Sequence, residues 1–517
     1  MQSILDKLEQ RMRGCQKSID LPLLKVVSVA ALASMLLAHG FAFANLFPNH
    51  DGTVLVFDAQ WTMYVLGRWA QNLYFPLVRG KIAAPWLIGA FSIVYVALTG
   101  YCIAFLLKLR RMAALVLTGI LGCCASLTAV MATYTYETDA YLLAMLLACA
   151  GIFFLEKGRP IIGFCTSAIL FCGCLALYQA YIQFALGLFL LILIRQALLD
   201  TSWRCWILHG VRALASLAAG AVLYLVSLKI SLAITGYQLA DTGNGLAQLT
   251  RLAPAAVAAG IPATYKNFFE TLLGYSGWND RGMRLATAFM LMLTLWGLFL
   301  RLRGSKCRTV VQTLIAVALL PFGLNVIYLL AGGNVYILMQ HALFLIYALP
   351  LLLLASEEIT CKVRAFWRWI VMLLCGFLIM RMVICANGAY VYTKLVYDQT
   401  ARQMTTIMAE VQQLPGYEEG TTSVVFVGDF TNSLFAYKDS AFNRYAEGDL
   451  HQVNSAVTYD GTIKWWFQHV MGSSANVVVD QTQRDTWATD PRVEAMPVYP
   501  NGGYCAMIDG TAIVRIS

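Results

Sequence analysis

Charged residues are scarce in this 517-residue sequence. Asp, Glu, Lys and Arg make up 13% of it and hydrophobic residues 59%, whereas about a quarter of the residues of a soluble globular domain are charged. The apolar residues form repeated runs near the roughly 20 residues that a helix needs to cross a bilayer, and not the alternating segments of an outer-membrane barrel. The composition therefore excludes a soluble domain and predicts an all-α polytopic membrane bundle.

Several sequence motifs are also missing. The 14 cysteines lie almost all inside apolar runs, and the polar C-terminal part has only Cys505, which excludes a disulfide framework or a CxxC metal pair. His39, His50 and His341 have no metal-ligand spacing, and each reads as a packed, hydrogen-bonded histidine. Walker, Rossmann and nucleophile-elbow motifs are absent. We therefore expect no metal, no cofactor, no nucleotide-sugar site and no nucleic-acid partner.

The charges are unevenly distributed along the chain. Residues 387–517 hold 14 acidic and 8 basic side chains, a net of −6, which leaves +15 for residues 1–386. The first 20 residues are polar and basic, unlike a cleavable signal peptide, so the first apolar run is expected to stay as a membrane anchor. Two regions with different surroundings are implied.

Eleven membrane spans are predicted from the apolar runs. Lys and Arg concentrate in alternate connections, which places the N-terminus in the cytoplasm and the C-terminal part outside. The fifth and sixth predicted spans are connected at 178–181 with no real loop. If one of these two spans were lost, the C-terminus would lie on the other side of the membrane. The predicted spans are 22–45, 83–107, 112–132, 140–155, 160–178, 179–195, 208–234, 284–300, 309–331, 338–355 and 366–386.

The predicted domains follow from these spans. A cytoplasmic segment, 1–21, precedes the transmembrane bundle, 22–386, which has outer loops at 46–82 and 235–282. Residues 387–517 are predicted to form a small periplasmic α/β domain, because an amphipathic helix near 398–413 precedes runs typical of buried strands. These runs are 424–427, 476–479 and 512–516.

The first outer loop is predicted to contain an interfacial helix. Apolar, aromatic and amide side chains recur in it at helical spacing and define one face, and the segment is too short to span the membrane. The residues of this face are Trp61, Tyr64, Val65, Arg68, Trp69, Asn72 and Leu73.

Four carboxylates of the predicted outer face could accept a proton during sugar transfer or bind sugar hydroxyls. Asp51 directly follows the first span, but Asp-Gly is also a turn dipeptide. Asp58 precedes the interfacial helix and could instead be its N-cap. Glu137 and Asp139 lie at the tight turn between spans three and four, where carboxylates are costly unless they bind something; the alternative is a charge that favours a helix start.

Cationic side chains are the candidates for binding a lipid phosphate. Arg68 lies on the interfacial face, and Lys229 and Arg381 lie inside apolar spans near their outer ends. Each of the three could alternatively extend to the lipid headgroups. Arg281 and Arg284, at the outer start of span eight, could join the same anion site, and Asp280 beside them is a further substrate-binding candidate.

Four short motifs together resemble the serotype-converting O-antigen glucosyltransferases, the GtrII-like group of GT-C glycosyltransferases. The resemblance covers most of the membrane part and depends on the order of the motifs. They are Asn49-His50-Asp51, Gly67-Arg68-Trp69, the Tyr-Glu-Thr-Asp-Ala-Tyr turn at 136–141 and Tyr178-Gln179-Ala180-Tyr181.

The resemblance implies a GT-C-like bundle in the bacterial inner membrane. It also implies a polyprenyl-phosphate glucose donor and transfer to a lipid-linked O-antigen on the periplasmic side. An acidic residue of the first outer loop would be the base; this role falls on Asp51, with Asp58 as the alternative, and Gln179 falls among the substrate-binding candidates. An O-antigen polymerase or ligase, and a flippase or transporter for a lipid-linked sugar, are the competing functions.

Overall fold

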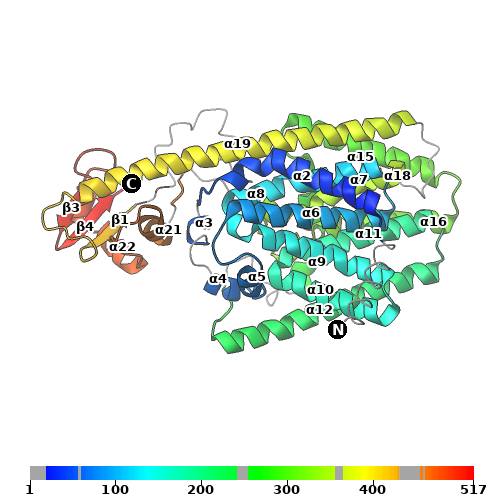
Figure 1. Cartoon of the computed structure of the whole chain (residues 1–517), viewed down its shortest axis with the longest axis horizontal. Helices are drawn as coiled ribbons and strands as arrows, with labels where there is room; N and C mark the ends of the chain where they lie inside the picture. Colours follow the sequence, from blue (N-terminus) through cyan, green and yellow to red (C-terminus); the bar gives the residue numbers. More distant parts are fainter. Residues whose placement is uncertain are drawn as a thin grey trace, which may run out of the picture.

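The chain folds into a helical bundle that carries a small domain at one end (Figure 1). We describe it from a computed structural model, which defines residues 19–49, 51–55, 60–240, 254–355, 365–428, 430, 455–457 and 460–517. Asp58 and His50 lie outside the described residues. We call the end of the bundle where the first long helix finishes, and where the small domain packs, the domain end.

Ten segments of the described chain are helical, long and apolar enough to cross a membrane. Prolines and polar caps begin several of them: Asp20 accepts a hydrogen bond from the Leu23 amide at the start of α2, and Pro85 and Pro160 stand at the first positions of α6 and α10. The helices of these segments are α2 (Leu21–Ala44), α6 (Pro85–Leu107), α7 (Arg111–Cys123) with α8 (Ala125–Thr133), η1 (Thr135–Glu137) with α9 (Thr138–Lys157), α10 (Pro160–Leu177), η2 (Gln179–Ile182) with α11 (Gln183–Leu198), α12 (Trp203–Thr235), α15 (Arg281–Leu302), α16 (Cys307–Leu324) and α19 (Ala365–Val411).

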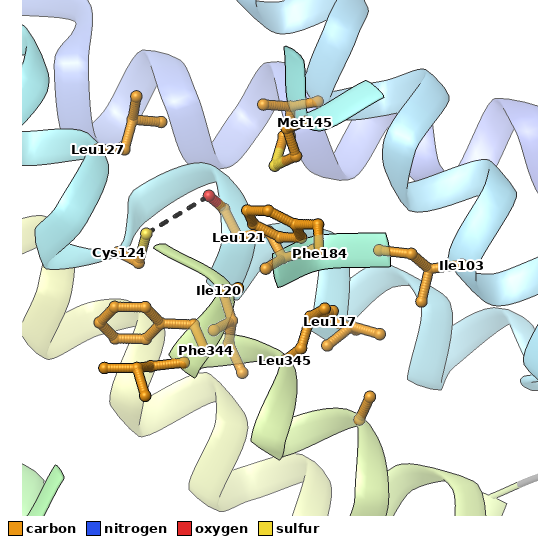
Figure 2. Close-up of a cluster of buried hydrophobic side chains, with 14 of the residues drawn as sticks. Ile103, Leu117, Ile120, Leu121, Cys124, Leu127, Met145, Phe184, Phe344 and Leu345 are labelled. Atoms are coloured by element: carbon orange, nitrogen blue, oxygen red, sulfur yellow. Dashed lines mark hydrogen bonds between the residues drawn. The ribbon is translucent and has the colours of Figure 1, made fainter. Parts of the chain in front are cut away.

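The α7–α8 segment forms the centre of the bundle, because 94% of its most apolar stretch is buried. Its helix is interrupted at Cys124, whose backbone is extended (φ −64°, ψ 158°). The Cys124 thiol donates to the Leu121 carbonyl at 3.7 Å, and the surrounding core includes Phe184 and Phe344 (Figure 2). The break occurs where packing is tightest, so its freed backbone groups need partners inside the protein.

The predicted span 338–355 is not a regular membrane helix. It consists of η3 (Ile337–Met339), η4 (His341–Tyr347) and α18 (Ala348–Ala355), and all of η4 is buried. A short apolar run is more often a buried core segment than a span, and hydropathy alone does not separate the two. The described residues therefore contain ten long apolar helices, and this buried segment stands in the place of the predicted eleventh span. Because α18 and the start of α19 lie at the end of the bundle away from the small domain (Figure 1), the chain still returns to that end before α19, and the predicted side of the C-terminus is not reversed.

The first outer loop departs from the predicted single interfacial helix. It forms α3 (Gly52–Leu55), α4 (Gln60–Val65) and α5 (Gln71–Val78). Gly67 has φ +73°, a left-handed conformation that ends a helix. Arg68 consequently lies in the turn between α4 and α5, and the predicted continuous face does not exist. Two further helices, α14 (Pro254–Leu273) and α17 (Val326–Leu330), pack together beside α16.

Helix α19 connects the bundle to the small domain. The predicted span 366–386 and the predicted helix 398–413 are parts of this one 47-residue helix, which runs along the bundle to the sheet (Figure 1). Its side chains belong to the bundle core up to Val396 and to the domain core from Met404. The domain also contacts the first outer segment directly, since Thr53 Oγ1 donates to the Ala456 carbonyl at 3.2 Å.

The small domain contains a four-stranded sheet in the order β2-β1-β4-β3. Strand β1 is parallel to both β2 and β4, and β3 is antiparallel to β4. The three predicted strand runs coincide with β1, β2 and β4, and β3 was not predicted. The elements are β1 (Ser423–Val427), α21 (Asp460–Trp465), η6 (Trp466–Val470), β2 (Asn476–Val477), α22 (Gln481–Ala488), α23 (Pro491–Glu494), β3 (Cys505–Ile508) and β4 (Thr511–Arg515).

Candidate active site

Asp51 lies against the end of α8 at the domain end of the bundle. The Tyr134 hydroxyl donates to its Oδ2 at 2.9 Å. The next residue is Gly52, where a Cβ would collide with the Thr133 carbonyl oxygen, so only glycine allows this close approach. The Asp-Gly turn is thus packed on the 133–134 backbone, which fixes the position of the Asp51 carboxylate.

Arg68 forms an ion pair with Glu137. Its Nη1 donates to Glu137 Oε1 at 2.9 Å and to Oε2 at 3.3 Å, and also to the Tyr141 hydroxyl at 2.7 Å. Glu137 is fully buried, and the Arg68 side chain is 18% exposed. The buried Arg68 Nε has no hydrogen-bond partner among the described residues, so the guanidinium retains donors that a bound anion could use.

Two stacked tyrosine rings flank this guanidinium. The Tyr141 and Tyr178 rings are parallel within 6°, with centroids 3.7 Å apart. The Arg68 guanidinium carbon lies 4.9 Å from the Tyr178 centroid and 5.5 Å from the Tyr141 centroid, within the range of a cation–π attraction. The rings and Glu137 together fix the orientation of the arginine.

The turn that carries Arg68 is anchored by Gln179 and Tyr224. The Gln179 amide donates to the Leu66 carbonyl at 3.0 Å and to the Tyr224 hydroxyl at 2.9 Å. The Tyr224 hydroxyl in turn donates to the Gly67 carbonyl at 2.9 Å. Gln179, predicted to bind substrate, therefore holds the backbone on both sides of the left-handed Gly67.

The second carboxylate of the turn, Asp139, pairs with Arg79. Arg79 Nε donates to Asp139 Oδ2 at 2.7 Å, and neither side chain is exposed. Tyr74 donates to the same oxygen at 2.9 Å, while Arg79 Nη2 donates to the Tyr136 carbonyl. Glu137 and Asp139 are thus each bound by a different arginine of the first outer segment.

Tyr134 lies among three of the predicted site residues. Burial raises the pKa of its hydroxyl well above the ordinary value; the Asp51 and Glu137 charges raise it further, and Arg68 opposes them. The hydroxyl therefore stays protonated near neutral pH and acts as a donor to Asp51. Tyr134 and Glu137 belong to one short turn, in which the Glu137 amide donates to the Tyr134 carbonyl at 2.9 Å. This turn binds Asp51 through Tyr134 and Arg68 through Glu137.

A comparison with protein families identifies the family of the chain. The model of the family "Glucosyl transferase GtrII" matches residues 40–356, more than half of the chain. The chain belongs to this family. The match contains the Asp51 turn, the Arg68 turn and the 136–141 motif, and it ends before α19. No curated protein and no solved structure matches the chain.

Membership of the GtrII family confirms the predicted resemblance. Together with the ten long apolar helices, it makes the chain a membrane glucosyltransferase. The small C-terminal domain and Arg381 lie outside the matched region.

The remaining predicted cations are not gathered around Tyr134. Lys229 is exposed on α12, a helix of which only 17% of the most apolar stretch is buried. Arg381 pairs with Asp280, which also caps α15 by accepting from the Met283 amide at 3.0 Å. Arg281 is exposed at the start of the same helix. Substrate contacts by these four GtrII residues stay predictions.

Two buried histidines of the GtrII chain bind the broken central helix. An α-helical Leu121 or Gly122 carbonyl would accept from the amide four residues later, a pattern that is interrupted at Cys124. His341 Nε2 lies 3.0 Å from the Leu121 carbonyl oxygen, and His39 Nε2 lies 3.0 Å from that of Gly122. The predicted packed, hydrogen-bonded role of both histidines is confirmed.

The other ring nitrogen of each histidine faces a tyrosine. His39 Nδ1 lies 2.6 Å from the Tyr390 hydroxyl, and His341 Nδ1 lies 3.2 Å from that of Tyr181. A carbonyl only accepts, so Nε2 carries the proton, and Nδ1 accepts from the tyrosine. Within the described residues, His, Cys, Asp and Glu form no group of three that could hold a metal ion.

Sequence reasoning did not include Arg79, Tyr134 or Tyr141 among the site residues. Two buried carboxylates at an embedded turn favour two cations nearby. The first outer loop offers Arg79 and Lys81 besides Arg68, so charge balance indicates a second cation from this loop without deciding between the two.

Proposed function

We propose that this GtrII-family member transfers glucose from a polyprenyl-phosphate donor to a sugar of a lipid-linked O-antigen. The reaction would take place at the periplasmic face of the inner membrane. The observation that carries the proposal is that one short turn, 134–137, binds both Asp51 and Arg68 at the domain end of the bundle: Tyr134 donates to Asp51, and Glu137 pairs with Arg68. An acid–base group and a cation that could bind phosphate are thus held by the same turn.

In the proposed reaction the acceptor hydroxyl oxygen attacks the anomeric carbon of the donor. The bond from this carbon to the phosphate oxygen breaks, and polyprenyl phosphate leaves with the electron pair. Asp51 takes the hydroxyl proton as general base. Tyr134 holds its carboxylate through Oδ2. A single displacement inverts the anomeric centre, so a β-linked donor would give an α-linked product.

Arg68 is proposed to offset the negative charge that grows on the departing phosphate. Its ion pair with Glu137 uses Nη1, and Nε has no partner among the described residues. Glu137 is buried, and its contacts with Arg68 and Tyr141 support a positioning role. We propose the same positioning role for Asp139, which orients Arg79. The alternative is that Glu137 or Asp139 binds sugar hydroxyls.

The charge distribution supports the proposed side of the membrane. The domain end carries the acidic C-terminal domain, and basic connections such as Lys108-Leu109-Arg110-Arg111 lie at the other ends of the helices, which favours a periplasmic domain end. A polymerase, a ligase or a flippase would share the lipid-linked substrates. The family match favours transfer of glucose over these functions.

The decisive experiment uses the full-length protein purified into lipid nanodiscs. Synthetic polyprenyl-phosphate glucose and a lipid-linked O-antigen acceptor are supplied, and the product is analysed by mass spectrometry and NMR. One added hexose with inverted anomeric configuration supports the proposal. Polymerised acceptor without added glucose would instead identify a polymerase, and absence of any covalent product under these conditions would contradict a transferase.

A further inference from the structure

A cavity lies apart from the residues that surround Asp51 and Arg68, and none of those residues lines it. It occupies about 210 Å³ between the end of α14, the turn that precedes α15 and the segment that leads into η4. This volume is smaller than the roughly 300–1,000 Å³ of pockets for drug-sized ligands, so the cavity suits one ring-sized group. The lining residues on which the argument depends are Asn267, Glu270, Tyr275, Trp278, Tyr336 and Gln340.

Three amide side chains fix the hydrogen-bonding character of the wall. Asn325 Nδ2 donates to the Thr264 backbone carbonyl at 3.0 Å and to Asn267 Oδ1 at 2.9 Å. Gln340 Nε2 donates to Asn267 Oδ1 at 2.8 Å and to Asn325 Oδ1 at 2.9 Å. Because a backbone carbonyl can only accept, it sets the orientation of Asn325 and, through it, of the other two amides.

This network leaves one donor group and one acceptor group for a ligand. Both amide hydrogens of Gln340 and of Asn325 are used within it. The Asn267 NH₂ and the Gln340 Oε1 make no hydrogen bond with the described residues, and both side chains line the cavity. An adjacent donor and acceptor match two neighbouring hydroxyls of a sugar, each of which donates and accepts.

The rest of the lining favours a neutral sugar over a charged group. Glu270 is the one charged residue among the described residues that line the cavity. Its partner Lys266, 3.6 Å away, and Arg284, 5.4 Å from the Tyr275 ring centre, contact lining residues but are not part of the lining. A phosphate inside the cavity would therefore meet a carboxylate before a cation. Trp278 is almost fully buried in the wall, and Tyr275 and Tyr336 are exposed. Aromatic rings with a polar edge offer both an apolar surface for a sugar ring and a hydrogen-bonding group.

A continuous series of contacts links this cavity to Arg68. Gln340 precedes His341, whose Nδ1 lies 3.2 Å from the Tyr181 hydroxyl. The Tyr181 ring packs edge-on against Tyr178 with centroids 5.0 Å apart. Tyr178 in turn contacts the Arg68 guanidinium. The cavity and the Arg68 site are therefore connected through one packed core.

We propose that this cavity binds one neutral sugar ring of the acceptor glycan, a role that rests on the proposed function. The donor is the less suitable source of the sugar, because its glucose carries a phosphate on the anomeric carbon and the wall has no cation to receive it. The cavity would then help to select which acceptor residue receives glucose.

The test replaces Asn267 by Asp. The new side chain has nearly the same shape and keeps the two accepted hydrogen bonds, but it loses the NH₂ donor. Asn334→Asp is the matched control, because Asn334 is exposed in the adjacent loop and is not part of the lining. Tyr336→Ala is a second variant, at an exposed position of the mouth. All proteins are full length, in nanodiscs, with circular dichroism as a check of folding.

Two readouts are compared. Saturation-transfer NMR measures binding of a lipid-free oligosaccharide of one O-antigen repeat and, separately, of methyl α-D-glucopyranoside. Steady-state kinetics measure KM for acceptor and for donor. We expect Asn267→Asp to weaken oligosaccharide binding and to raise KM for acceptor roughly tenfold, the effect of one lost hydrogen bond, with KM for donor unchanged and the control like the parent.

Unchanged oligosaccharide binding in both Asn267→Asp and Tyr336→Ala would overturn the proposal. A rise in KM for donor alone, with loss of methyl glucoside binding, would overturn it in favour of a donor site. If the parent transfers no glucose but its oligosaccharide binding depends on Asn267, the proposed function fails while the sugar site stands.

Discussion

Arg68 and Glu137 are 69 residues apart in the chain, yet Nη1 of the arginine lies 2.9 Å from Oε1 of the glutamate. The contact joins the turn after α4 to the short helix that precedes α9. The contact fixes one nitrogen of the guanidinium, and the stacked Tyr141 and Tyr178 rings beside it restrict the orientation of the group further.

Replacing Arg68 by Ala should lower kcat/KM for the polyprenyl-phosphate donor by about 10- to 150-fold, the equivalent of a charge-assisted hydrogen bond of roughly 1.5–3 kcal/mol. Arg68→Lys should recover little, because a single ammonium nitrogen cannot pair with Glu137 and also supply the separate Nε donor proposed for the phosphate. Parental kinetics in both variants would reduce Arg68 to a structural anchor.

Replacing Asp51 by Asn should reduce glucose transfer by roughly 10²–10⁴-fold, because the side chain keeps its shape but no longer accepts a proton. The amount of folded protein in the membrane should not change. Asp58→Asn is the matched control and should have a much smaller effect. Near-normal transfer by Asp51→Asn together with an inactive Asp58→Asn would assign the base to Asp58.

Tyr134→Phe should leave a folded enzyme with an altered pH profile. The variant removes a hydrogen bond that the charged form of the Asp51 carboxylate accepts, so the carboxylate becomes easier to protonate. The acidic limb of kcat/KM should therefore move to higher pH. A loss of activity that is equal at every pH would instead indicate that Tyr134 acts only on packing.

Asp200→Asn should remove a pH-dependent contribution to stability at the opposite end of the bundle. Hydrogen bonds from Lys306, Arg308 and Thr309 lower the pKa of the Asp200 carboxyl below its ordinary value. A lowered pKa stabilises the fold above the unfolded value, about 3.9, and this contribution is lost as pH falls through the folded pKa. Asn also tolerates the left-handed backbone at this position (φ +62°).

The measurement is the thermal midpoint in detergent across the pH range. The parent should exceed Asp200→Asn near neutral pH, and the difference should shrink under strongly acidic conditions. A difference that is independent of pH would contradict the assignment.

His341→Ala should destabilise the bundle by about 2 kcal/mol or more, because it leaves the Leu121 carbonyl and the Tyr181 hydroxyl without their buried partner. Chemical unfolding in mixed micelles measures the change in free energy. Cys165→Ala, at an exposed cysteine of α10, is the control. Equal stability of the two variants would show that the broken helix does not need this histidine.

Most long helices were predictable because a membrane span needs a long apolar run bounded by charges, and the chain carries both signals locally. The errors in the predicted secondary-structure elements have local and non-local causes. Gly67 is a local sign that the interfacial helix ends. Asp509-Gly510 is a turn sequence typical of a β-hairpin, and it indicates the strand β3 that was not predicted. All three residues have positive φ. These signals were present and outweighed by periodicity.

Other features were not accessible from local patterns. The 338–355 segment is as apolar as a span, and it differs only because η4 packs inside the protein and His341 binds the break in α7–α8. The partner of Asp139 is 60 residues away in sequence, so its identity depends on the tertiary fold. The site was therefore predictable in its residue types and not in its pairings.

The continuity of α19 has a mechanical consequence. At 1.5 Å per residue its 47 residues extend about 70 Å. The first domain-core position, Met404, follows the last bundle-core position, Val396, by eight positions. One residue inserted there would rotate the domain by about 100° and separate Ala456 from Thr53. Seven inserted residues would restore the angle and raise the domain by about 10 Å. The helix thus sets both the height and the azimuth of the domain above the Asp51 turn.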